Sequence, residues 1–256
     1  MQKITDTHIH LYAEQFEPDL DQLIEKAVTS GVECFFMPNI DSTSIESMLN
    51  LEKKFPENCF PMMGLHPCSV KDNWRDEMKI VEDWLSKRKF FAVGEMGIDL
   101  YWDKTFIEEQ KIVFKRQAEL ANQYKLPIVI HTRDSFEVAI QLLKEIKKEE
   151  PFGIFHCFTG NVQEAKQVTD MGFLLGIGGV VTFKNGGLDK TLEQINLKDV
   201  VLETDAPYLA PAPFRGKRNE PVYILKVAER ISEVKNVPVE EVIRITTENS
   251  KRVFGV

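Results

Sequence analysis

Histidine has the widest chemical use of any residue in this sequence, because its side chain can transfer protons near neutral pH or bind a metal ion. The 256-residue chain contains five histidines: His8, His10, His66, His131 and His156. They fall in the stretches TDTHIH, MMGLHP, PIVIHTR and GIFHCF, each at the end of an apolar run typical of a buried strand. Stability alone gives no reason to confine imidazoles to strand ends, so we expect a shared function.

Carboxylates occur at matching places in the sequence. Glu95 follows the run FFAVG, and Glu203 and Asp205 end the stretch VVLETD, two residues apart. A buried carboxylate without a partner costs several kcal/mol or takes up a proton. Arg133 is the cation available at these strand ends, and one guanidinium cannot neutralise three carboxylates. A divalent metal ion does so better.

Two histidines separated by one residue, as His8 and His10 are, point to the same side of a strand. They can pack, titrate or jointly hold a metal, and the nearby carboxylates favour the metal. The predicted ligands are four imidazoles and two carboxylates: His8, His10, Glu95, His131, His156 and Asp205. An imidazole-rich set suits Zn²⁺ or Mn²⁺ better than Mg²⁺. Six ligands fit two divalent cations about 3.5–4 Å apart, with Glu95 as the natural bridge.

The elements that must position these residues can be read from the alternation of apolar runs with amphipathic segments. The apolar runs begin near Ile4, Val32, Phe60, Phe90, Pro127, Phe152, Phe173 and Val200. Eight strand–helix units predict a single (β/α)8 TIM barrel over residues 1–256, with the metal site at the carboxyl ends of the strands. A doubly wound open sheet is the alternative that alternation leaves open.

Two helical segments give sharper expectations. Segment 135–148 places Phe136, Ile140 and Leu143 on one stripe, opposite lysines and glutamates, as expected of a helix packed on strands. Segment 178–195 is rich in glycine, and we expect a short helix in this seventh unit.

Composition narrows the possible partners and location. The formal net charge of −8 argues against broad coating of nucleic acid but allows a local phosphate site. No apolar run reaches the length of a membrane span, and the start lacks the pattern of a secretory signal. The four cysteines have no CxxC spacing, which predicts reduced thiols in a cytoplasmic protein. We expect no membrane partner and a monomer.

Seven motifs follow one another along the chain: DTHIHL, GLHP, VGEMGID, IHTRD, FHCFTG, ETDAP and the tail RGKRNEP…TTENSKRVFG. In this order they resemble the TatD-type metal-dependent deoxyribonucleases, within the wider metal-dependent hydrolase barrels. An HxH pair alone is weak evidence, whereas seven motifs in the right order, covering essentially the whole chain, are specific.

The resemblance implies a role for each matching position. The HxH pair and Asp205 would hold a first metal, and His131 and His156 would bind a second. Glu95 would bridge the two, at a position where many relatives in the superfamily carry a carboxylated lysine. Family members are nucleases acting on DNA ends and single strands, several of them 3′–5′ exonucleases assisted by Mg²⁺. The expected reaction is hydrolysis of a DNA phosphodiester by a metal-bound hydroxide.

Three residues are expected to support this reaction. Asp205 is the expected proton acceptor. Glu203 lies in phase with it and is either a neighbouring partner, an alternative base or a residue that orients a metal-binding histidine. His66, before Pro67, contacts a phosphate, donates a proton to the leaving oxygen, or holds the turn.

The chain also offers residues for binding substrate. Arg133 presents a planar fork to a phosphate, unless it pairs with Asp134 or Glu137. Tyr101 and Trp102 can stack on a base or simply pack at the rim. The loop APAPFRGKRNEP gathers three cations that we expect on the DNA backbone: Arg215, Lys217 and Arg218. Phosphate sites recur in barrels after the seventh and eighth strands.

Two other functions remain open at this point. A hydrolase of the same barrel could act on another ester, such as D-aminoacyl-tRNA or a small phosphoester, since one ligand set serves carbonyl and phosphoryl centres alike. A non-catalytic metal-binding scaffold is the alternative from a different class, although it would have no use for Glu203, Asp205 and Arg133.

Overall fold

The fold is described from a computed structural model of the chain, over residues 3–146, 152–184 and 186–256. These residues form eight strands: β1 (Ile4–Asp6), β2 (Val32–Pro38), β3 (Cys59–Met62), β4 (Val93–Asp99), β5 (Ile128–Arg133), β6 (Gly153–Phe155), β7 (Leu174–Ile177) and β8 (Val200–Leu202). Most begin at or next to the predicted residue. The exception is β4, which begins at Val93 rather than near Phe90.

The strands are parallel and pair in chain order, as β1-β2-β3 and β4-β5-β6-β7-β8. Two narrow seams join these sets. At one seam Met63, just beyond β3, forms a bridge with Val93, and its N–H donates to the carbonyl of Ala92 at 3.1 Å. At the other, the N–H of Thr7 donates to the carbonyl of Leu202 at 3.0 Å. A sequential order that closes on itself is a barrel, and it excludes the doubly wound alternative, in which the order reverses.

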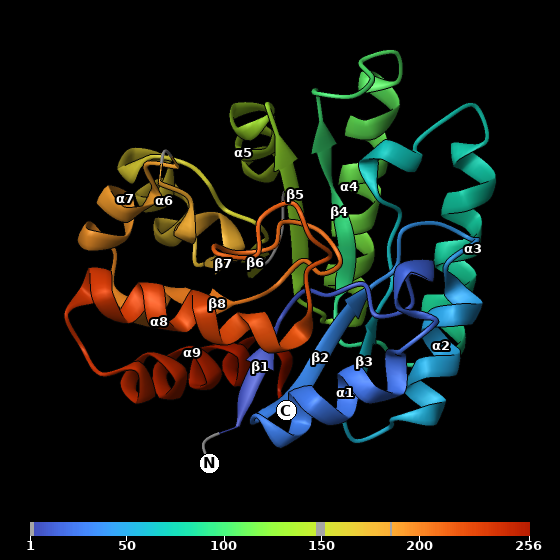
Figure 1. Cartoon of the computed structure of the whole chain (residues 1–256). Helices are drawn as coiled ribbons and strands as arrows, with labels where there is room; N and C mark the ends of the chain where they lie inside the picture. The colour runs from blue at the N-terminus through green and yellow to red at the C-terminus, as the bar shows by residue number, and fades with distance from the viewer. Residues whose placement is uncertain (1–2, 147–151, 185) are drawn as a thin grey trace.

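Helices surround the strands (Figure 1). In the described part of the chain they are α1 (Leu20–Thr29), α2 (Ile45–Lys54), α3 (Trp74–Lys87), α4 (Ile107–Tyr124), α5 (Phe136–Glu145), α6 (Val162–Asp170), α7 (Leu188–Gln194), α8 (Ile224–Lys235) and α9 (Val239–Phe254). The short seventh-unit helix is confirmed, since α7 has seven residues. None of the described helices combines the length and apolar composition needed to cross a membrane.

The stripe predicted for segment 135–148 forms the inner face of α5. Ile140 and Leu143 are buried there, and Phe136 packs against the same core. The end of the predicted segment, from residue 147 onward, lies outside the described residues.

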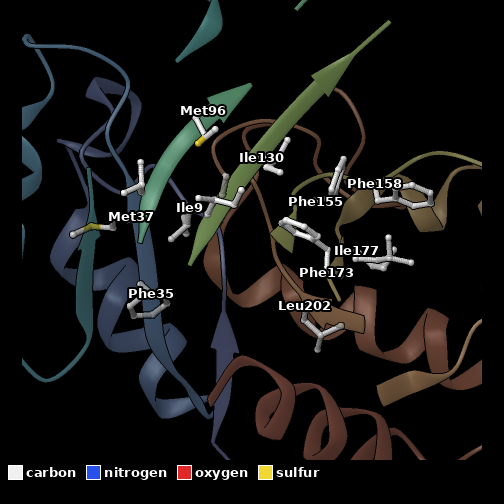
Figure 2. Packing of buried hydrophobic residues seen from close by; sticks show 14 of the residues in the cluster. Ile9, Phe35, Met37, Met96, Ile130, Phe155, Phe158, Phe173, Ile177 and Leu202 are labelled. Atoms are coloured by element: carbon white, nitrogen blue, oxygen red, sulfur yellow. The ribbon is translucent and has the colours of Figure 1, made fainter. Parts of the chain in front are cut away.

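Strand side chains alternate between an outer and an inner core, as the two-residue period of a strand requires. Phe35 and Met37 of β2 belong to the outer core between strands and helices, together with Ile130 and Leu202 (Figure 2). Phe36, between them in sequence, belongs to a second cluster inside the barrel.

This second cluster forms an apolar floor for the barrel. Six strands contribute one residue each, and Ala92 lies just before β4: Phe36, Met62, Ala92, Val129, Ile154, Leu174 and Val201. Phe254 of α9 completes the floor, with its ring stacked 3.7 Å from that of Phe36. Two residues after Val129, Ile154 and Val201, on the same side, come His131, His156 and Glu203. The polar residues therefore stand on an apolar layer.

Replacing Phe254 with alanine should lower the free energy of unfolding by about 3–5 kcal/mol, because the floor would lose a buried ring. Urea denaturation followed by circular dichroism measures this change. Phe152→Ala is the matched control, because the Phe152 side chain is exposed, and it should cost less than about 0.5 kcal/mol. Equal losses in the two variants would contradict the role given to Phe254.

Candidate metal centre

The carboxylate of Glu95, buried on β4, lies at the centre of a polar cluster. The other members of this cluster are His8, His10, His66, His131, His156 and Asp205. Its Oε2 lies 3.0 Å from Nε2 of His8 and 3.9 Å from Nε2 of His10. Asp205, in the loop after β8, places Oδ1 3.4 Å from Nε2 of His10 and 3.9 Å from Nε2 of His8. Three distant segments thus meet around this oxygen of Glu95.

The other oxygen of Glu95 faces a second group of imidazoles. Oε1 lies 2.8 Å from Nδ1 of His131, on β5. It also lies 3.5 Å from Nε2 of His66 and 3.6 Å from Nε2 of His156, which follow β3 and β6. One carboxylate therefore stands between two sets of histidines.

Tyr12 fixes the position of the proton on His10. The tyrosine hydroxyl donates its one hydrogen to the carbonyl of Pro38, so its oxygen accepts a hydrogen from Nδ1 of His10, 2.8 Å away. Burial, followed by the charge of Glu95, raises the pKa of Tyr12 well above its ordinary value, so the hydroxyl keeps its proton. Nε2 of His10 is left with a lone pair, which is the arrangement of a metal-binding histidine.

Carboxylates also lie beside the ring nitrogens of His131 and His156 that point away from Glu95. Oδ2 of Asp99 lies 3.0 Å from Nε2 of His131, and Nδ1 is the nitrogen that faces Oε1 of Glu95. Oε1 of Glu203 lies 3.1 Å from Nδ1 of His156 and accepts the backbone N–H of Cys157 at 2.6 Å, and Nε2 of His156 faces Glu95. Glu203 is fully buried. Of the roles open for Glu203, this geometry favours orienting a histidine.

His66 has the opposite arrangement. Its Nδ1 accepts a hydrogen bond from the backbone N–H of Cys68 at 3.0 Å. A neutral imidazole then carries its hydrogen on Nε2, which faces Glu95. His66 therefore presents a donor to the cluster rather than a lone pair, consistent with the sequence prediction that leaves it out of the ligand set.

These residues fit divalent cations. Among the described residues neither ring nitrogen of His8 has a hydrogen-bond partner, although both are buried. Ligand atoms about 2.0–2.2 Å from one cation lie roughly 3–3.6 Å from one another, close to the separations found around Glu95. Burial lowers the pKa of His156, but Glu203 and Glu95 together raise it to about 10. The cluster thus attracts positive charge, as protons or as metal.

Hydrogen bonds in the loop after β8 hold Asp205 in place. Asp6 accepts from both the N–H and the hydroxyl of Thr204, at 3.0 and 2.6 Å. Asn219 donates through Nδ2 to the carbonyls of Thr204 and Tyr208, at 2.8 and 2.7 Å. Asp6 lies in the motif DTHIHL and Asn219 in RGKRNEP, but neither residue was predicted to give this support.

A glycine makes room for Glu203. A Cβ on Gly176 of β7 would lie 2.2 Å from Oε2 of Glu203, so no larger residue fits without moving the carboxylate. The sequence offered no signal for this pairing of distant positions.

A cavity of about 980 Å³ opens above the cluster. Its walls include Trp102, Arg133, Arg215 and Lys217, all predicted to bind substrate. Among the described residues no carboxylate forms an ion pair with Arg133, so the predicted alternative of pairing with its acidic neighbours is not found. Its guanidinium instead lies 3.8 Å from the centre of the Tyr101 ring.

The structure does not support the prediction that Arg218 contacts DNA. Its guanidinium forms a two-pronged ion pair with Asp19, at 2.8 and 2.6 Å, and donates to the carbonyl of Gln15 at 2.7 Å. Arg218 is also not among the residues that line the cavity, unlike Arg215 and Lys217. Its charge holds the loop against the segment that follows β1.

A parallel barrel with imidazoles and carboxylates gathered at the carboxyl ends of its strands defines a metal-dependent hydrolase. The chain belongs to the TatD family of these enzymes. The family model described as "TatD related DNase" matches residues 5–255.

Relatives and solved structures agree with this assignment. The metal-dependent hydrolase YabD of Bacillus subtilis is 40% identical over 252 residues, covering 98% of each chain. The metal-dependent hydrolase YcfH of Escherichia coli is 30% identical over 260 residues, covering 99% of this chain and 96% of YcfH. The crystal structure of YjjV, a TatD homologue from Escherichia coli, is similar with a TM-score of 0.93, at 26% identity over 99% of this chain and 98% of that one.

Tyr12→Phe should weaken metal binding by about 10- to 100-fold, because His10 would lose the oxygen that accepts its Nδ1 hydrogen. Competition with a chromophoric chelator measures the affinity. Tyr208→Phe is the matched control: both tyrosine rings meet the His10 ring edge-on, at 5.7 and 5.8 Å, but only Tyr12 reaches Nδ1 with its hydroxyl. An unchanged affinity in Tyr12→Phe would contradict this role.

Proposed function

We propose that this chain hydrolyses DNA phosphodiester bonds at a two-metal site, acting on single strands or ends as a 3′–5′ exonuclease. One observation carries the proposal: Glu95 presents its two oxygens to two sets of imidazoles, below a cavity with cationic walls. The exonuclease mode and its direction rest on the resemblance to the TatD nucleases.

The ligand geometry suggests how two cations would be shared. The HxH pair and Asp205 would hold one, His131 and His156 the other, and Glu95 would bridge them. When bound, such cations lower the pKa of a water molecule and neutralise charge on phosphoryl oxygens.

The chain's own residues supply the remaining functions. Asp205 accepts the proton of the attacking water, since its carboxylate lines the cavity. Burial raises the pKa of Asp205, but His10, His156 and His8 together hold it below the ordinary value, so the carboxylate is ionised and able to accept. His66, with its hydrogen on Nε2, donates to a phosphoryl or leaving oxygen.

Three cationic residues support binding of a phosphate backbone. Arg133 has no carboxylate partner among the described residues and offers a planar fork. Arg215 rests on the ring of Phe183 at 4.0 Å, and Lys217 is exposed beside it. We propose that DNA is held locally by these groups, in a chain whose overall charge is negative. The four free thiols support a reducing, cytoplasmic location.

Removing metal should abolish hydrolysis of a single-stranded oligodeoxynucleotide, and adding Zn²⁺, Mn²⁺ or Mg²⁺ should restore it to different degrees. The measurement is a panel of single- and double-stranded DNA, RNA, a small phosphodiester and D-aminoacyl-tRNA, with metal-reconstituted protein. Asp205→Asn, purified in the same way, should lose at least a hundredfold in rate, which controls for contaminating nucleases. Preferred cleavage of the aminoacyl ester would replace the proposal with the alternative hydrolase.

Reversing the charge of Arg215 and Lys217 together should raise KM for oligonucleotide about tenfold or more, because hydrogen bonds to charged groups contribute about 1.5–3 kcal/mol each. Hydrolysis of a small phosphodiester should stay unchanged. The control, Lys79→Glu with Lys89→Glu, changes the net charge equally at exposed positions outside the cavity. A similar rise in KM in both double variants would point to net charge instead of local contacts.

A further inference from the structure

Two large aromatic side chains stand exposed beside the metal centre. Tyr101 and Trp102, just after β4, are 53% and 68% exposed. Their rings meet edge-on, with centres 4.9 Å apart. Trp102 lines the cavity above the polar cluster. An aromatic that only packs at the rim would be covered, and these two are not.

The carboxylate of Asp99 fixes the backbone of Tyr101 and Trp102 relative to the candidate metal site. Oδ1 of Asp99 accepts the backbone N–H of Tyr101 at 2.9 Å and that of Trp102 at 3.2 Å. Oδ2 of the same residue lies 3.0 Å from Nε2 of His131. Gln110 of α4 in turn accepts the N–H of Asp99 at 3.0 Å. The two exposed aromatic residues and His131 are therefore held by the same side chain, that of Asp99.

A cation without an ion-pair partner completes the arrangement. The guanidinium of Arg133 lies 3.8 Å from the centre of the Tyr101 ring and 5.1 Å from that of Trp102. Among the described residues no carboxylate pairs with it, so its hydrogen-bonding edge remains available for an anion. An exposed aromatic face next to a free guanidinium matches a planar base joined to a phosphate.

We propose that Trp102 is the residue that stacks on the base of the nucleotide next to the scissile phosphate, with Arg133 on the backbone of that nucleotide. This rests on the function proposed above. A base inside a duplex is covered on both faces by its neighbours, whereas an unpaired base can offer a whole face to the indole. Such stacking tolerates any base sequence, because every base has a planar face.

The proposal is tested with two single-stranded oligodeoxynucleotides that differ only in the nucleotide at the cleaved end, which is normal in one and abasic in the other. Trp102→Ala should lower kcat/KM on the normal strand about 5- to 100-fold. It should leave the abasic strand within about twofold of the wild type. The wild-type protein should prefer the normal strand by the same factor. Trp102→Phe, which keeps an aromatic face, should retain most of the preference.

Phe152→Ala provides the matched variant, since it removes an exposed aromatic outside the cavity and should behave as wild type on both strands. Equal loss on both strands in Trp102→Ala would overturn the stacking role, as would a wild type that does not distinguish them. A Trp102 dependence found on RNA but not on DNA would overturn the choice of substrate. Failure of the wild type to hydrolyse any DNA would instead remove the proposed function, and the inference with it.

Fluorescence gives a readout that does not depend on turnover. The chain has three tryptophans, and Trp74 and Trp84 both lie on α3, away from the cavity. Adding metal-loaded protein to an oligonucleotide with a non-hydrolysable end linkage should quench Trp102 emission, and the abasic version should not. Trp102→Phe should remove the quenching. Quenching that persists in this variant would contradict stacking on Trp102.

Discussion

The rest of the site depends on the burial of one carboxylate among five imidazoles. Burial raises the pKa of Glu95, but His8, His156 and His66 together hold it well below its ordinary value. An ionised carboxylate in this position is stable only when positive charge surrounds it, as protons on the histidines or as cations between them. Its two oxygens face different histidines, and the proposal of two metal positions rests on this division.

The barrel supplies the surroundings that this carboxylate needs. Alternation along β5, β6 and β8 puts an apolar residue in the floor and a polar one in the layer above it, as in Val129 and His131. Glycine in the neighbouring strand then leaves space for long side chains, and Gly176 does so for Glu203. Because water is kept out from below, substrate reaches the cluster through the cavity at the carboxyl ends of the strands.

The sequence predicted the barrel and the convergence of the metal-site residues, because strand ends in a parallel barrel share one face. It could not predict which ring nitrogen of a histidine faces the cluster, because nothing in the sequence links Tyr12 to His10 or Asp99 to His131. The prediction that Arg218 contacts DNA rests on its position beside Arg215 and Lys217 in the sequence. Its partner Asp19 lies in a distant segment, and only the packing of the loop brings the two together.

The floor residue Phe254 and the loop of Asp205 have a consequence for how the protein is made. The ring of Phe254 stacks on that of Phe36, although the two residues lie far apart in the sequence. The polar cluster likewise brings His8, which follows β1, next to Asp205, which follows β8. A ribosome-bound chain that still lacks α9 has an open floor, and one that lacks β8 also lacks a carboxylate of the cluster. Synthesis must therefore pass β8 and α9 before the site can assemble, and a chain translated only to an earlier point has no complete centre with which to act.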